Sequence, residues 1–484
     1  MVSSALAYIG LYFMTRYLGT EIYGTVTYTM AFVATFNAVS DLGFGSAHVK
    51  KVSEGEDPNA CISTYAAIKL ILTGAMVVLV LTSVFIWTGP MGNALSGTSI
   101  DLILLFVLYQ VLYDLSAIAT TTFQARMEMA KMPLVTLIDP LVRVPLIIFV
   151  SVNRMGVWEL ALAYVIGAIA VAALALFLMF REKVRWQRPV LMRQYFNFAL
   201  PLILITIIST VSGSADKLII GAFWTTSDVG LYTAPAVFLG VFATVSTAVS
   251  TLTFPSFSKL HAEGNLAEIR EMSKQAERYI AMISLPITVL IIMFPYEVCL
   301  ILLGPLFIES GDAIAIMAVT NFLTMMNAVH GSQIVAVGRP DISARITILT
   351  VAINISLMLL FIPQYGLGLS YVGAALALMI GNIVGFIMVR YAVWRLTRTP
   401  PNPRLALHLV AGAAAALAMF ALDMVISVDR FYTLIVFGLV AFAAYLPVLA
   451  LVGELKKADL QYFLDLINVR KMLAYISGEL REKK

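Results

Sequence analysis

Apolar residues fill most of this chain in continuous runs, and short polar segments separate the runs. Each run is roughly 20 residues long, the length that a helix needs to cross the roughly 30 Å hydrocarbon core of a bilayer. A strand would alternate instead, and an open sheet edge cannot satisfy its backbone in lipid. The pattern predicts an all-α polytopic membrane protein with about 14 transmembrane helices, at 2–18, 26–48, 62–87, 101–125, 134–152, 156–180, 196–222, 231–254, 276–303, 311–336, 342–362, 368–394, 405–426 and 431–452.

One stretch near the middle of the chain, 196–235, restarts a pattern first met near the N-terminus. With Gly230 placed over Gly24, six of 18 positions are identical, against roughly two expected by chance for so apolar a composition. The alternative is that two spans merely share a composition. We favour two similar six-helix lobes. Because six spans separate the copies, both lobes enter the membrane in the same sense, and their pseudo-two-fold axis lies along the membrane normal.

The repeat divides the chain into five parts. They are an N-terminal six-helix lobe (1–181), a basic cytoplasmic linker (182–195), a C-terminal six-helix lobe (196–395), two extra helices (396–452) and a tail (453–484). The tail is too polar to span. Its apolar residues recur at helical spacing beside lysines and arginines, which favours an amphipathic helix on an anionic inner leaflet. A regulatory partner site is the alternative for this tail.

The positive charges fix the expected topology. With both termini in the cytoplasm, the cytoplasmic segments hold 26 lysines and arginines, and the outer segments hold only Arg16, Arg154 and Arg430. This asymmetry is what the positive-inside rule predicts, and a miscounted span would have scrambled it. We therefore expect a multi-pass protein of the cell membrane.

Composition excludes most other classes. Hydrophobic residues make up 60% of the chain and charged residues 12%, which no soluble domain of this size shows. The two cysteines fit neither a metal site nor a disulfide framework. No cleavable signal peptide is visible, and the first span, about 27 Å of helix, is so short that residues upstream of Met1 or a small tilt are expected. No loop is long enough to form a soluble catalytic domain.

Charges inside the spans are the candidate functional residues, because each basic residue at the centre of an isolated helix costs about 2.5–3.5 kcal/mol. Lys69, Arg143 and Lys217 lie within spans, and Arg16 lies at an outer rim. We expect them to line a cationic, water-filled cavity between the lobes and to bind an anionic group. Arg16 has a second interpretation as a snorkelling residue at a helix end.

Three carboxylates near these cations are candidates for proton or cation coupling: Asp114, Asp139 and Asp216. Asp139 and Arg143 are four residues apart on one helical face, so a local ion pair is the alternative role for both. Asp216 and Lys217 are adjacent and point about 100° apart on a helix. We therefore expect that they do not neutralise each other and that at least one faces another partner.

Several short motifs resemble one family. The segments LGTEIYG (18–24), DLGFG (41–45), FALP (198–201), SADKLIIGAF (214–223), DVGLYTAP (228–235) and FPSFSKL (254–260), placed on 14 spans, are similar to the polysaccharide-biosynthesis branch of the multidrug/oligosaccharidyl-lipid/polysaccharide exporter superfamily, which includes the O-antigen flippases. The order and spacing of the motifs are more specific than any one of them. The resemblance covers nearly the whole chain.

The resemblance implies a V-shaped pair of six-helix lobes that alternates between inward-open and outward-open states. The implied cargo is a polyprenyl-diphosphate-linked oligosaccharide, moved from the cytoplasmic to the outer leaflet. Implied partners are this lipid, the surrounding membrane lipids and a glycosyltransferase or polymerase that acts on the same cargo. No nucleic acid, cofactor or metal is expected.

Three other functions were weighed. A multidrug or cation antiporter of the same superfamily typically has 12 spans and often a carboxylate in its first span, which this chain lacks. A membrane glycan polymerase or transferase needs catalytic residues on an outer loop, but no Asp-x-Asp pair occurs and the outer loops are nearly uncharged. A scaffold or receptor would not explain buried charges of both signs.

Overall fold

The computed structural model describes residues 2–88, 97–128, 131–181 and 184–455, and in these residues it is all-α. The long helices are α1 (Val2–Tyr17), α2 (Gly19–Asp41), α4 (Pro58–Thr88), α5 (Gly97–Ala125), α6 (Lys131–Val152), α7 (Val157–Arg181), α8 (Met192–Phe223), α9 (Thr226–Ala262), α10 (Leu266–Met293), α12 (Gly311–Ala336), α13 (Pro340–Phe361), α14 (Ser370–Thr397), α15 (Leu405–Asp423) and α16 (Phe431–Leu451). Three short helices, α3 (Phe44–Ser53), α11 (Pro295–Leu302) and η1 (Pro305–Ser310), lie between them.

Each of these 14 long helices overlaps one of the 14 predicted spans, although α2 and α10 begin and end earlier in the chain than predicted. Within the described residues, 12 of them are long and apolar enough to cross a membrane. The other two are α1, which has only 16 residues, and α2, which is rich in threonine. Helix α2 packs against α4, α5, α8 and α9, so its polar side chains face protein rather than lipid.

Two of the predicted spans are broken. The span 26–48 is divided into α2 and α3 at Leu42 and Gly43, which both adopt left-handed backbone conformations. The span 276–303 ends as α10 at Met293 and restarts as α11 at Pro295, whereas Pro286 remains inside α10. The first break follows from a glycine at positive φ, and the second from a proline that cannot continue the helical hydrogen bonds.

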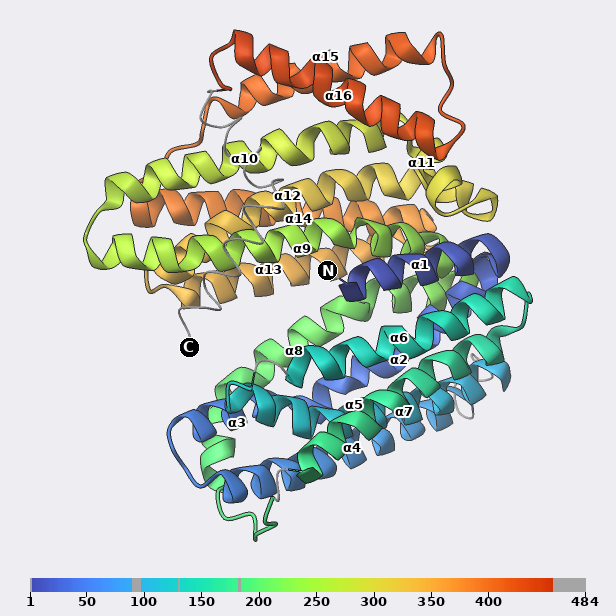
Figure 1. Cartoon of the computed structure of the whole chain (residues 1–484), viewed down its shortest axis with the longest axis vertical. Coiled ribbons are helices and arrows are strands. Elements are labelled where there is room, and N and C mark those ends of the chain that lie inside the picture. The colour runs from blue at the N-terminus through green and yellow to red at the C-terminus, as the bar shows by residue number, and fades with distance from the viewer. Residues whose placement is uncertain (1, 89–96, 129–130, 182–183, 456–484) are drawn as a thin grey trace.

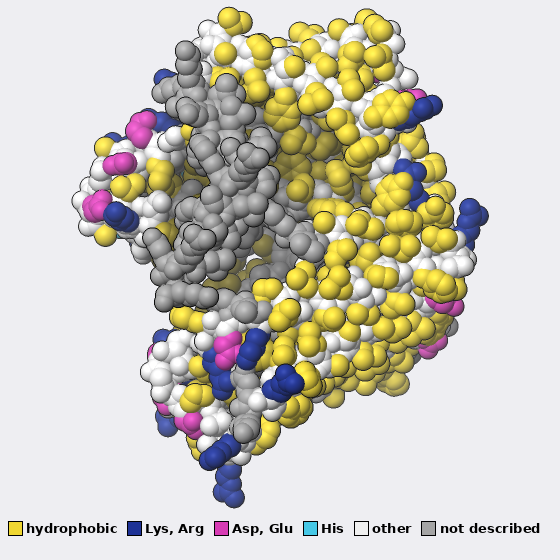
Figure 2. Space-filling view, viewed as in Figure 1, with side chains coloured by type: hydrophobic (Ala, Val, Ile, Leu, Met, Phe, Trp, Pro, Cys, Tyr) yellow, Lys and Arg dark blue, Asp and Glu magenta, His cyan; other side chains and the backbone are white. Residues whose placement is uncertain are grey.

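The outer surface fits a membrane protein. Side chains such as Phe85, which is 72% exposed, and Leu200, which is 68% exposed, point outward from the helices. Figure 2 shows hydrophobic side chains from top to bottom across the middle of this face and most charged ones at its left and right edges. Such a surface is favourable only in contact with lipid.

The helix pairings of α1–α7 recur in α8–α14. Helix α5 packs on α7 as α12 packs on α14, α6 on α7 as α13 on α14, and α1 on α6 as α8 on α13. Helices α15 and α16 pack on each other and on α10, at the outer edge of the C-terminal helices. The exact bounds of the lobes and the linker stay predictions, and nearly all of the predicted amphipathic tail lies outside the described residues.

Helices α2 and α9 form the central contact between the two sets. At their crossing, a Cβ on Gly24 would overlap the carbonyl oxygen of Thr226, and one on Gly230 would overlap the carbonyl oxygen of Thr20. These four residues are related in pairs by the same offset of 206 positions that relates Gly24 to Gly230. The contact is therefore reciprocal, as expected of an interface on a pseudo-two-fold axis.

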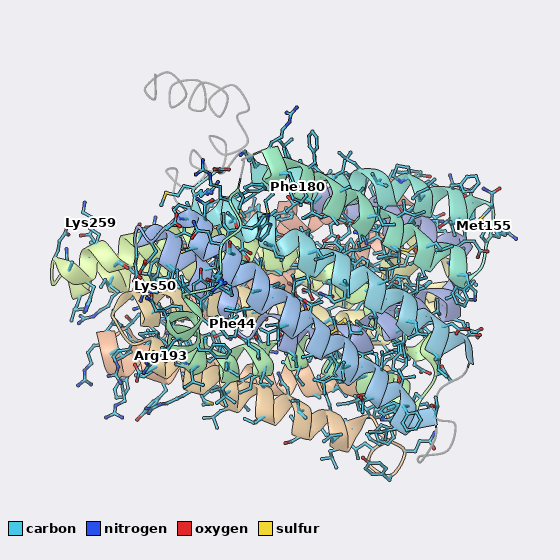
Figure 3. The ribbon with its side chains drawn as sticks, turned by 90° about the horizontal axis from the view of Figure 1, so that it is seen from below. Phe44, Lys50, Met155, Phe180, Arg193 and Lys259 are labelled. Carbon is cyan, nitrogen blue, oxygen red and sulfur yellow. The ribbon has the colours of Figure 1, made fainter. Side chains whose placement is uncertain are left out.

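Hydroxyl groups of α2 and α9 form hydrogen bonds at the same crossing. Thr20 Oγ1 lies 2.6 Å from Ser227 Oγ, and Thr25 Oγ1 donates to Thr226 Oγ1 at 3.1 Å. Figure 1 shows the two sets of helices converging at this side and diverging toward the other. Figure 3 places Lys50, Arg193 and Lys259 at one end of the helices and Met155 at the opposite end.

Candidate cation-lined cavities

Two neighbouring cavities lie where the two sets of helices meet, and each contains one basic side chain. The first, here called the Lys217 cavity, has a volume of about 280 Å³. Its lining comes from α2, α5, α8 and α9: Thr27, Met30, Ala31, Val33, Ala34, Phe106, Tyr109, Gln110, Gly213, Ser214, Lys217 and Thr233. Lys217 is the only charged residue among them.

The second, here called the Arg143 cavity, has a volume of about 240 Å³. It is lined by Ala7, Gly10, Leu11, Met14, Tyr23, Thr27, Met30, Arg143, Val144, Ile147, Tyr164, Thr233 and Val237. Arg143 is its only charged lining residue. The two cavities share Thr27, Met30 and Thr233, so they are adjacent. The fold thus brings two of the predicted cations to one region between α2 and α9.

Lys217 forms its contacts within α8. Its Nζ lies 3.1 Å from Asp216 Oδ1 and donates to the carbonyl oxygen of Gly213 at 3.2 Å. The prediction that adjacent Asp216 and Lys217 do not neutralise each other is therefore wrong. The argument considered only the directions of the Cα–Cβ bonds, whereas the four-carbon lysine chain is flexible enough to bend back toward its neighbour. A lysine has three N–H donors, so one is left after these two contacts.

Arg143 and Asp139 form the expected pair on one face of α6. Arg143 Nη2 donates to Asp139 Oδ2 at 2.8 Å, and the guanidinium carbon lies 4.6 Å from the centre of the Tyr164 ring. A buried acceptor, Asp139 Oδ1, and a buried donor, Arg143 Nε, have no partner among the described residues. Gly167 on α7 makes room for the pair, since a Cβ there would lie 2.6 Å from Asp139 Oδ1.

Lys69 and Asp114 lie apart from both cavity linings. They join α4 to α5 in an ion pair of 2.9 Å, with each side chain 5% exposed. Lys69 Nζ also donates to the carbonyl oxygen of Ser40 at 3.0 Å. Lys69 is thus fully engaged with protein groups, and Asp114 has a cation as its closest partner.

Arg16 lies at the junction between the two sets of helices. Its Nη2 donates to the carbonyl oxygen of Ile301 on α11 at 2.6 Å, and its guanidinium carbon lies 4.5 Å from the Tyr12 ring centre. It lines neither cavity. The arginine therefore joins α1 to the C-terminal helices.

A buried ionic cluster between α10, α12 and α14 was not predicted from the sequence. Glu277 Oε1 on α10 lies 2.7 Å from His330 Nε2 on α12 and 2.5 Å from Arg390 Nη1 on α14. His330 and Glu277 are almost completely buried. The sequence offered a partial signal, because Glu277 and His330 both lie within predicted spans, 276–303 and 311–336. Each half of the protein therefore buries an ionic cluster, Lys69 with Asp114 in the first and Glu277 with His330 and Arg390 in the second.

Comparisons with known proteins agree with this architecture. The family model described as "Polysaccharide biosynthesis protein" matches residues 13–312. The curated "Probable low-salt glycan biosynthesis flippase Agl15" of Haloferax volcanii is 22% identical over 391 residues, which are 80% of this chain and 79% of that protein. The "Probable flippase AglR" of the same organism is 26% identical over 209 residues, 42% of this chain and 43% of that protein.

Solved structures establish the fold. "Lipid II flippase MurJ, inward closed conformation" superposes with a TM-score of 0.74 at 14% identity and covers 96% of this chain and 98% of its own. An inward-facing multidrug resistance MATE family transporter of the MOP superfamily gives a TM-score of 0.66 at 15% identity and covers 82% and 96%. The chain therefore belongs to the polysaccharide biosynthesis protein family and is a multi-pass membrane protein with the fold of the MOP transporters.

Proposed function

We propose that this protein moves a polyprenyl-diphosphate-linked oligosaccharide from the cytoplasmic to the outer leaflet of the cell membrane by alternating access. The observation that carries the proposal is the pair of adjacent cavities between α2 and α9, each with a single cation in an otherwise uncharged lining. The relatives named as flippases support the class of cargo. Glycosyltransferases that make the cargo and a polymerase that consumes it are the proposed pathway partners.

The chemistry of the cargo fits these cations. A diphosphate carries negative charges that cannot cross hydrocarbon unaided, and arginine can bind phosphate oxygens in a bidentate manner while lysine acts as a point charge. In the described state the carboxylates paired with Arg143 and Lys217 are Asp139 and Asp216, each on the same helix as its cation. An arriving diphosphate competes with these carboxylates. Asp139 and Asp216, once released, are the proposed acceptors of a proton or a metal cation.

The cavity volumes indicate that the protein changes conformation when it binds its cargo. Ligand pockets typically measure about 300–1,000 Å³, and both cavities fall just below that range. A headgroup with several sugars needs a larger space, so the two sets of helices must separate before it enters. On the predicted topology the α2–α9 contact lies on the outer side, and the cargo enters from the cytoplasmic side while its polyprenyl tail stays in the bilayer.

The test is leaflet translocation of a polyprenyl-diphosphate oligosaccharide in proteoliposomes. We expect the wild type to move the lipid, and Arg143→Ala and Lys217→Ala to be slower by about tenfold or more, since a hydrogen bond to a charged group contributes about 1.5–3 kcal/mol. Lys259→Ala is the matched control, because that lysine side chain is 78% exposed and distant from the cavity linings.

A double variant distinguishes the loss of cargo binding from the loss of stability that an unpaired carboxylate causes. If Arg143→Ala acts only by leaving Asp139 unpaired, the neutral pair Asp139→Asn with Arg143→Ala restores translocation; we expect no such recovery. Equal rates in all variants would assign both cations to structural ion pairs. A wild type that moves no lipid, even with a proton or sodium gradient, would favour small-molecule export.

A further inference from the structure

The break between α2 and α3 leaves a free carbonyl group inside the protein. Helix α2 ends at Asp41, and Leu42 and Gly43 turn the backbone with positive φ values of 48° and 84°. The last carbonyl groups of a helix receive no hydrogen bond from the N–H groups of that helix, and they carry partial negative charge. The carbonyl oxygen of Ser40 is one of these, and it accepts a hydrogen bond from Lys69 Nζ.

Several oxygen atoms surround this ammonium group. Asp114 Oδ1 lies 2.9 Å from Lys69 Nζ, the Ser40 carbonyl oxygen 3.0 Å and Ser40 Oγ 3.3 Å. Carbonyl, hydroxyl and carboxylate oxygens at the end of an interrupted helix are the groups that hold alkali-metal cations in membrane proteins. Lys69 and Asp114 are each only 4% exposed, so this oxygen cage is buried in the protein. Gln110, which lines the Lys217 cavity, donates to Asp114 Oδ1 at 3.4 Å.

A second layer of hydrogen bonds fixes the cage. Thr73 Oγ1 donates to Asp114 Oδ2 at 3.1 Å, and Gln110 Nε2 donates to Asn37 Oδ1 at 2.9 Å. Ser40 Oγ also donates to Asn37 Oδ1. The oxygen atoms are therefore held in place from α2, α4 and α5, independently of the lysine.

The other half of the protein lacks this arrangement. The repeat places Ser246 over Ser40, and there α9 continues without a break from Thr226 to Ala262. Ser246 Oγ donates to Phe242 within the same helix. The fold thus accommodates a continuous helix at this position, and the break in the first half is a local feature that supplies the cage with its carbonyl oxygen.

We propose that the cage formed by Ser40 and Asp114 is a monovalent-cation site that the chain fills with its own ammonium group, that of Lys69. Removal of the lysine side chain creates a site for sodium or potassium, with Asp114 as the charged ligand. In the wild type Asp114 is not free to bind a metal cation in this state, so any coupling ion acts elsewhere. This site is independent of the proposed cargo.

The test uses thermal unfolding of the purified full-length protein in detergent, in sodium, potassium and choline chloride at equal ionic strength. We expect the midpoint of Lys69→Ala to rise saturably, by about 2–4 °C, in sodium or potassium relative to choline, because a bound ligand stabilises the folded state. The wild type should unfold at one temperature in all three salts. Lys69→Met, whose uncharged chain fills the same space, should respond less.

The double variant Lys69→Ala with Asp114→Asn is the control for charge. It should lose the response to metal cations, and in choline it should be more stable than Lys69→Ala, which leaves a buried carboxylate unpaired. The proposal is overturned if Lys69→Ala unfolds alike in all three salts or if the wild type responds as strongly. It is also overturned if Lys69→Ala cannot be obtained in any salt while the double variant can.

Discussion

Lys217 and Arg143 each keep a carboxylate of the same helix as counter-ion, and this decides what each can do. An ion pair inside the membrane avoids the cost of an isolated charge, so neither cation needs a bound anion as its counter-ion. A phosphate group can replace the carboxylate in either pair, since each cation has one carboxylate partner. Lys69 differs, because its contacts come from other helices and its side chain lines neither of the two cavities.

Gly167 gives a residue-scale prediction about the Asp139–Arg143 pair. A methyl group there would lie 2.6 Å from Asp139 Oδ1 and 3.1 Å from Arg143 Cβ. We expect Gly167→Ala to lower the free energy of unfolding by about 1–3 kcal/mol, as overpacking does, and to slow lipid translocation because the guanidinium shifts.

Gly74→Ala is the matched control, because no atom lies within 4 Å of a Cβ built at Gly74. Unfolding midpoints in detergent and translocation rates should match the wild type for this variant. A Gly167→Ala protein with wild-type stability would show that the pair tolerates displacement.

Ion pairs within one helix could be predicted from the sequence, whereas ion pairs between helices could not. The spacing of Asp139 and Arg143 predicts their contact. The contact of Lys69 with Asp114, and that of Glu277 with His330 and Arg390, depend on which helices pack together. The prediction for Lys217 and Asp216 failed for a different reason. The direction of the Cα–Cβ bond does not determine where the end of a flexible side chain lies.

At the scale of helices, the crossing of α2 and α9 depends on two glycines. A Cβ on either would overlap the backbone of the other helix. We predict that Gly24→Ala and Gly230→Ala separate the helices and break the hydrogen bond between Thr25 and Thr226. Each should lower the free energy of unfolding by about 1–3 kcal/mol, measured as a lower unfolding midpoint in detergent.

A glycine on α12 serves as the control for this prediction. Gly331→Ala adds a methyl group where nothing lies within 4 Å, so its unfolding midpoint should stay unchanged. If Gly24→Ala and Gly331→Ala behaved alike, the close crossing of α2 and α9 would not contribute to the folded state.

The number and the order of the helices could be predicted from the sequence because each apolar run must match the bilayer thickness. The breaks were harder. Pro295 begins a new helix just after α10, whereas Pro286 stays inside α10. The turn at Leu42 and Gly43 was not predicted, because both residues lie in an apolar run. Hydropathy records which residues tolerate lipid and not where a backbone bends.

For the whole molecule, the recurring helix pairings and the reciprocal Gly24–Gly230 contact support a protein of two similar halves that meet on one axis. We propose that the two halves rock about α2 and α9, opening one side as the other closes. The described state is closed at Thr20 and Ser227 and divergent at the other side. In alternating access, this contact must open once in every transport cycle.

The most direct test of this account is a disulfide across the closed side. Thr20 Oγ1 and Ser227 Oγ are 2.6 Å apart, so Thr20→Cys with Ser227→Cys should form a disulfide, and the native Cys61 and Cys299 are buried and do not compete. In proteoliposomes we expect the oxidised protein to stop translocating the lipid-linked oligosaccharide, and a reductant to restore the wild-type rate. Each single-cysteine variant should be unaffected by oxidation. Wild-type translocation by fully cross-linked protein would contradict the account.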